Sequence, residues 1–196
     1  LGYVTMGMSI VPMIGPAVGG VLEASFGWQS NFWLLLIVGG ALWLLTYFDL
    51  GETAPPSSGT FADQVRQYPD LLTSRRFWGY CAASAFASGA FFAYLGGAPF
   101  VGTSVFGMSP ETLGLYFGAP ALGYLVGNGI SGRFSQRIGI DRMILWGAIG
   151  QVSGLTVLAI ITLSGFTSHY VFFGFMTFVG LGNGLVIPNA TAGMLS

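Results

Sequence analysis

Long uncharged runs alternate with short charged segments along this chain. Residues 1–22, 24–48, 77–110 and 143–196 contain no Asp, Glu, Lys or Arg. About 20 apolar residues cross the hydrocarbon core of a bilayer, and 143–196 as one helix would be roughly 80 Å long. That last run must therefore contain a break between two helices. The break is expected at Ser164–His169, which is polar and contains a glycine. The pattern predicts six membrane-spanning helices, at about 1–22, 31–48, 77–97, 111–131, 143–163 and 169–192.

The segments between these runs have turn and loop composition. Residues 49–76 form the longest polar stretch, with a weakly amphipathic helix expected within 61–72. Ser109-Pro110-Glu111 is typical of a helix start, since Ser caps, Pro suits the first turn and Glu favours the positive end of the helix dipole. Residues 132–142 are expected to form a tight charged turn.

Composition supports the same class of protein. Hydrophobic residues make up 53% of the 196 positions and charged residues only 7%, against about 25% charged in a soluble domain. The fold class expected is therefore an all-α polytopic membrane protein. The net charge of −1 gives no indication of nucleic-acid binding. The single cysteine, Cys81, lies in an apolar run, so neither a disulfide framework nor a metal site is expected.

The arginines predict the orientation in the membrane. All six basic residues are Arg, and they lie only in 49–76 and 132–142. Both segments fall on the same side if there are six spans. By the positive-inside rule that side is cytoplasmic, so the first helix runs outward.

The candidate site residues are neutral amides and aromatics within the predicted spans. Amides in a span interrupted by Gly and Pro indicate a transporter's binding region, whereas hydrogen bonding between helices is the equally weighted alternative. Phe91 and its neighbours are candidates for an aromatic pocket, with lipid contact as the alternative. His169 is expected at a helix end, where an interfacial role is favoured over proton relay. The possible substrate-lining residues are Tyr80, Phe91, Tyr94, Asn128, Asn183 and Asn189.

The first span is rich in residues that weaken helices in water. Gly15 and Gly19 form a GxxxG pair, which lets another helix approach backbone to backbone. Two prolines in the same span favour a bent helix, which suggests a hinge between moving parts; a plain packing face is the alternative. The hinge residues predicted are Gly7, Pro12, Gly15, Pro16, Gly19 and Gly20.

The segment from 132 to 142 carries a second pattern, Gly132-Arg133-x-x-x-Arg137-x-Gly139. Its glycines permit a tight turn, and its arginines suit a helix C-terminus or a neighbouring carboxylate. A latch between conformations and simple positive-inside anchoring remain equally open here.

These patterns resemble those of major facilitator drug exporters. Gly15-Pro16-x-x-Gly19-Gly20 is similar to the antiporter motif of their fifth helix. The Gly132–Gly139 pattern is similar to their loop between helices eight and nine, with Gln136 where an Asp is usual. Gly27-Trp28-Gln-Ser-Asn-Phe-Trp33, Gly97-Ala98-Pro99 and Pro188-Asn189-Ala190 resemble the bicyclomycin-resistance (Bcr/CflA) group in particular.

The resemblance implies a fragment that covers helices five to ten of a twelve-helix bundle. Residues 1–48 would end the N-terminal bundle, 49–76 would be the central cytoplasmic loop, and 77–196 would begin the C-terminal bundle. It implies a monomeric exporter of amphipathic drugs in the bacterial inner membrane. No cofactor is expected, and the proton gradient would drive transport. The proton-coupling carboxylate is expected outside this sequence, because no carboxylate lies at a predicted mid-membrane position. A metabolite exporter of the same fold, for amino-acid-like or sugar-like solutes, and a non-transporting membrane scaffold are the alternatives. A membrane enzyme is disfavoured because no catalytic cluster is present.

Overall fold

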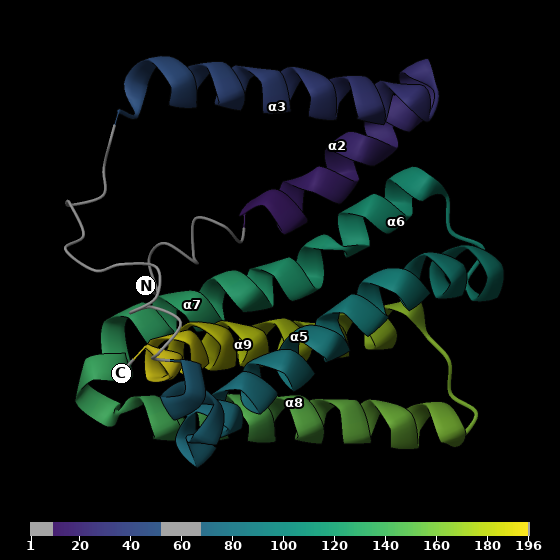
Figure 1. Cartoon of the computed structure of the whole chain (residues 1–196). Coiled ribbons are helices and arrows are strands. Elements are labelled where there is room, and N and C mark those ends of the chain that lie inside the picture. The colour runs from purple at the N-terminus through teal and green to yellow at the C-terminus, as the bar shows by residue number, and fades with distance from the viewer. Residues whose placement is uncertain (1–9, 52–67, 196) are drawn as a thin grey trace. The chain divides into compact units, whose positions relative to one another are not determined.

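The computed structural model describes the backbone of residues 10–51 and 68–195, with the side chains of these ranges except residues 10–13. Both ranges are largely helical and contain no β-strand (Figure 1). The predicted all-α class is confirmed. In chain order the elements are α2 (Ile10–Phe26), α3 (Gln29–Asp49), α5 (Arg75–Phe100), the π-helix η1 (Val101–Val105), α6 (Pro110–Tyr116), α7 (Gly118–Ile138), α8 (Ile140–Leu163) and α9 (His169–Met194).

Over the described residues, helices lie at the positions of the six predicted spans, the first of them from residue 10 onward. By length and composition, α3, α5 continued by η1, α8 and α9 are long and apolar enough to cross a membrane. The apolar part of α2 is shorter over the described residues, and α6 and α7 divide the fourth predicted span. A short helical segment at 68–73 overlaps the end of the predicted surface helix, of which 61–67 lie outside the described residues.

Two predicted boundaries are wrong. The helix from Arg75 does not end near 96–99 but runs through Pro99 to Phe100 and into η1. A proline there removes one backbone donor, and the hydroxyl of Thr103 donates to the Pro99 carbonyl at 2.8 Å. In lipid an unsatisfied backbone costs more than a local adjustment of the helix, so helical structure continues.

The predicted charged turn at 132–142 is mostly helix. Gly132, Arg133 and Arg137 lie in the last turns of α7, and α8 begins at Ile140. Gly139 alone reverses the chain, with a φ of 93° that other residues rarely adopt. One left-handed glycine after a helix is sufficient to end it, so a long turn is unnecessary.

The fourth predicted span is broken, as its glycines and proline suggested. Ser109 caps α6, accepting from the backbone N–H of Thr112 at 3.3 Å, and α6 ends at Tyr116. The ring of Pro120 conflicts with the carbonyl four residues earlier, at residue 116. The break therefore falls one turn before the proline.

The described residues divide into two compact units, one of 10–18 with 75–195 and the other of 19–51 with 68–74, which are described separately. In the first unit α9 is central, packing against α7, α8 and α5 (Figure 1). In the second, Gly27 turns the chain between α2 and α3 with a φ of 82°. The amide of Asn31 donates there to the Gly19 carbonyl at 3.4 Å. The predicted domain boundaries at 48, 49, 76 and 77 remain a prediction.

Candidate functional site: a helical interior of aromatics and amides

Mutually fitted glycines set the closest helix contact in the first unit. Gly123 and Gly127 of α7 face Gly180 and Gly184 of α9. A Cβ at Gly123 would overlap the Thr177 carbonyl, and one at Gly180 would overlap that of Pro120. Because small residues allow this approach, α7 and α9 pack backbone to backbone.

Buried amides join the helices on both sides of α9. The Gln151 amide of α8 donates to the Asn183 side-chain oxygen at 2.7 Å and to the Val179 carbonyl at 3.0 Å. The Asn189 amide donates to the Ser131 hydroxyl of α7 at 2.8 Å. Hydrogen bonds between helices are therefore present. Whether substrate also reaches Asn183 and Asn189 stays a prediction.

Asn128 is fully buried in α7. Its amide donates to the Tyr124 carbonyl of its own helix at 3.0 Å. Gly184 of α9 approaches the backbone of Asn128 closely, since a Cβ there would lie 2.6 Å from the Asn128 nitrogen. The structure thus places Asn128 at the α7–α9 contact.

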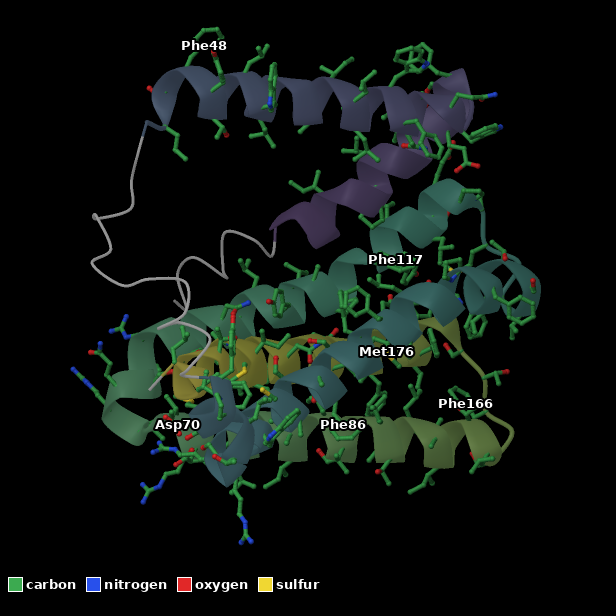
Figure 2. All side chains as sticks on the ribbon, viewed as in Figure 1. Phe48, Asp70, Phe86, Phe117, Phe166 and Met176 are labelled. Atoms are coloured by element: carbon green, nitrogen blue, oxygen red, sulfur yellow. The ribbon has the colours of Figure 1, made fainter. Side chains whose placement is uncertain are left out.

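An aromatic cluster occupies the interior between α5, α7 and α9. Tyr94 lies 5.4 Å from Phe117 and 6.4 Å from both Phe91 and Phe172, measured between ring centroids. Tyr94 is 93% buried, as its 7% exposure shows, and its hydroxyl has no hydrogen-bond partner among the described residues. Figure 2 shows Phe117 and Met176, which belong to the same core, among the packed helices. A buried polar atom without a partner is costly, so Tyr94 is a ready anchor for a ligand.

The end of this unit where η1 meets the start of α9 is also aromatic. His169 at the start of α9 lies 5.4 Å from Tyr116 and 6.0 Å from Phe106, between ring centroids. A cavity of about 610 Å³ opens nearby, lined by η1 and the facing ends of α8 and α9, including Phe166, which Figure 2 labels. His169 is thus part of an aromatic cluster at a helix end.

The predicted hinge is only partly described. Gly7 lies outside the described residues, and Pro12, Gly15, Pro16, Gly19 and Gly20 lie within α2. A Cβ at Gly15 would meet nothing within 4 Å, whereas one at Gly19 would meet the Asn31 side-chain oxygen at 3.3 Å.

Sequence analysis missed the close neighbour of Pro16. A Cβ at Gly114 of α6 would lie 3.0 Å from the Pro16 carbonyl oxygen. Gly114 and Pro16 belong to the same unit. The only signal in the sequence was that Gly114 is one of several glycines in the predicted span at 111–131. The sequence did not indicate that it would lie against Pro16.

The two arginines of the Gly132–Gly139 pattern are exposed at the end of α7. The Arg133 guanidinium lies 5.9 Å from the ring of its neighbour Phe134. A latch role stays a prediction.

Tyr80 lies near the start of α5 and is not part of the aromatic cluster around Tyr94. Its hydroxyl donates to the Asp141 carboxylate at 2.7 Å and accepts from the Arg76 guanidinium at 3.1 and 3.2 Å. The ring packs on Gly193 of α9. Tyr80 thus joins the start of α5 to that of α8, a contact across 61 residues that no local pattern predicted.

The interior of the first unit offers mainly aromatic and amide side chains. Among residues 10–51 and 68–195 no three His, Cys, Asp or Glu side chains gather to form a metal site. The Cys81 thiol sulfur lies 3.3 Å from the Met194 sulfur. The arrangement offers aromatic surface, satisfied amides and one unpaired phenol. That combination suits a small amphipathic ligand.

These features define a polytopic α-helical membrane protein with closely packed helices that contain prolines. The chain belongs to the Major Facilitator Superfamily, whose family model matches residues 1–196.

Its relatives include drug transporters. An uncharacterized MFS-type transporter, YdgK of Bacillus subtilis, is 33% identical over 79% of this chain and 40% of its own length. The multidrug transporter MdfA of Edwardsiella piscicida is 31% identical over 79% of this chain and 38% of its own. A bicyclomycin resistance protein homolog of Haemophilus influenzae is 24% identical over the whole chain and 50% of its own length. The resemblance to these drug transporters is confirmed, and this chain spans half or less of their length. No solved structure matches the chain significantly.

Proposed function

We propose that the full-length protein exports small amphipathic drugs across the bacterial inner membrane, by proton antiport and alternating access. The names of MdfA and of the bicyclomycin resistance homolog describe drug transport or resistance in those proteins. The interior of the first unit is consistent with such cargo, because it is aromatic and formally uncharged at mid-depth.

The unpaired Tyr94 hydroxyl is the observation that carries this proposal. A phenol held among Phe91, Phe117 and Phe172 offers ring surface for the apolar part of a drug and one hydrogen bond for its polar part. A site for amino acids or sugars would instead need several charged or polar groups aimed at the ligand. Amphipathic cargo is therefore favoured over metabolites.

The test uses full-length protein carrying Tyr94→Phe. Removing an unpaired buried hydroxyl should leave the fold equally stable or stabilise it by about 1–3 kcal/mol. Affinity for drugs that accept a hydrogen bond should fall about tenfold, the equivalent of one lost bond. Drug binding, efflux from energised cells and thermal stability are measured together.

Tyr47→Phe is the matched control, since Tyr47 is 72% exposed on α3, and it should change none of these three quantities. Unchanged drug affinity in a folded Tyr94→Phe protein would remove Tyr94 from the site. Failure of the parent protein to export any drug would overturn the function itself.

We further propose that the proton-coupling carboxylate lies in the part of the protein beyond this sequence. A coupling group must load and release protons near the cargo. The mid-membrane polar groups of this chain are amides, hydroxyls and phenols, which do not titrate near neutral pH. The predicted monomeric state and the proton gradient as sole energy source belong to the same proposal.

A further inference from the structure

The aromatic cluster around Tyr94 brings together a donor without an acceptor and an acceptor that lacks its usual donor. The donor is the Tyr94 hydroxyl, which is buried and has no partner among the described residues. The acceptor is the backbone carbonyl of Tyr116, a residue that packs against the same cluster. Phe117, which Figure 2 labels, is the single residue between α6 and α7, and its ring centroid lies 5.4 Å from that of Tyr94. The carbonyl is therefore one residue away from a ring that contacts the unpaired phenol.

Pro120 removes the helical donor of the Tyr116 carbonyl. In a regular helix this carbonyl would accept from the backbone N–H of residue 120, which a proline lacks, and the proline ring also pushes the carbonyl aside. Pro120 is fully buried and lies in the first turn of α7. The backbone N–H that caps α6, that of Phe117, donates to the carbonyls of Leu113 and Leu115. A carbonyl without its donor inside a membrane needs another partner.

A second proline removes a donor close by, but in a different setting. Pro99 of α5 cannot donate to the carbonyl of Leu95, which also packs against the cluster. There the helix continues to Phe100, whereas one helix ends at Tyr116 and the next begins two residues later. Carbonyls at a helix end are the ones that lack partners within their helix. The Tyr116 carbonyl is therefore the better acceptor of the two.

We infer that this site selects cargo in which an N–H donor stands beside a C=O acceptor, as in a secondary amide. The inference rests on the proposed drug export and names the polar group of the cargo. The cargo carbonyl accepts from the Tyr94 hydroxyl, and the cargo N–H donates to the Tyr116 carbonyl. The apolar part of the cargo lies against the rings of Phe91, Phe117 and Phe172, which surround Tyr94.

The paired groups distinguish an amide from an ester of the same shape. An ester keeps the carbonyl that accepts from Tyr94 but has an oxygen in place of the N–H. The lone pairs of that oxygen would face those of the Tyr116 carbonyl, and neither group could donate. Sites that hydrogen-bond a substrate N–H reject the analogue that lacks it, because a polar group of the site is left unpaired.

The experiment compares two probes on purified full-length protein, an N-alkylbenzamide and the alkyl benzoate of the same chain length. The readout is the ratio of their Kd values, because the difference in hydration between the probes cancels when this ratio is compared between variants. The parent should bind the benzamide about threefold to tenfold more tightly than the benzoate, the equivalent of one hydrogen bond.

Pro120→Ala supplies the missing N–H to the Tyr116 carbonyl, so the preference for the benzamide should disappear. Tyr94→Phe should weaken both probes by a similar factor and keep the preference. Pro188→Ala is the matched control, since it also restores one backbone N–H but lies in α9 outside the aromatic cluster, and it should keep the preference as well. Thermal stability is measured for each variant. If Pro120→Ala does not fold, the preference of the parent decides the question.

Two results would overturn the inference: a parent that binds both probes equally, and a preference that survives in folded Pro120→Ala. Loss of the preference in Pro99→Ala but not in Pro120→Ala would overturn the assignment to Tyr116 and place the acceptor at Leu95. A parent that exports drugs without distinguishing the two probes would contradict this inference alone. A parent that exports no drug would contradict the proposed function.

Discussion

Helices α9 and α3 have the same mean hydropathy but differ in burial. Half of the most apolar window of α9 is buried inside the described structure, and none of that of α3 is. Gly180 and Gly184 of α9 lie against α7 and Gly182 lies against α8, whereas Gly39 and Gly40 of α3 would gain a Cβ without meeting any atom within 4 Å. Apolarity therefore determines which segments can enter a bilayer, while small residues and amides determine which helices pack together.

The α7–α9 contact should be the most sensitive to substitution. Gly180→Ala places a Cβ against the Pro120 carbonyl, so we expect a loss of about 3 kcal/mol or more, at the upper end for overpacking. Gly40→Ala in α3 is the control and should cost nothing. Folded yield and thermal stability of the full-length protein measure both changes. A Gly180→Ala protein as stable as Gly40→Ala would show that the close contact is absent.

The α8–α9 amide pair should have a smaller effect. Gln151→Leu leaves the buried Asn183 oxygen without this donor, which should cost about 1–3 kcal/mol. The double change to leucines at 151 and 183 should cost less than the two single changes added together. The coupling energy expected from a double-mutant cycle is about 0.6–1.7 kcal/mol. A coupling energy of zero would mean that the two side chains act independently.

The motif in α2 should separate packing from transport. Gly19→Leu should impair transport without preventing insertion. A Cβ alone at position 19 would lie 3.3 Å from the Asn31 side-chain oxygen, so the larger leucine side chain would be forced against Asn31. Gly15→Leu is the matched change where nothing lies within 4 Å, and we expect a weaker effect. Export by well-expressed full-length variants measures the difference. If both variants export drug normally, α2 is not a hinge.

The smallest effects are expected at the titratable groups of the helix ends. Glu23→Gln, Glu111→Gln and His169→Gln should each leave pH-gradient-driven efflux close to that of the parent, because each lies near a helix end. His169 keeps its aromatic neighbours at Tyr116 and Phe106 regardless of coupling. Drug–proton exchange measured in vesicles tests each variant. A variant that still binds drug but no longer exchanges protons would place coupling in this part of the protein.

Many residues of the candidate site were predicted from the sequence, but the sequence did not show which of them lie together in space. Tyr94 and Phe91 were predicted as aromatic lining and do lie in one cluster. Tyr80 was grouped with them, yet it bonds to Arg76 and Asp141. Helical spacing places a residue on a face, but the neighbours of that face depend on how whole helices pack. Phe117, Gly114 and Asp141 were missed for the same reason.

The sequence by itself determined the class of protein and the approximate positions of the helices, and it placed the break between α7 and α8 within 132–142 without selecting Gly139. These depend on local physics, since every backbone group in lipid must bond within its own helix and a left-handed turn requires glycine. Only the tertiary structure decided that Gly123 meets α9, that Gln151 bonds to Asn183, and that Tyr80 connects α5 to α8. A glycine or an amide has many possible partners along an apolar chain, and the packing of whole helices selects among them.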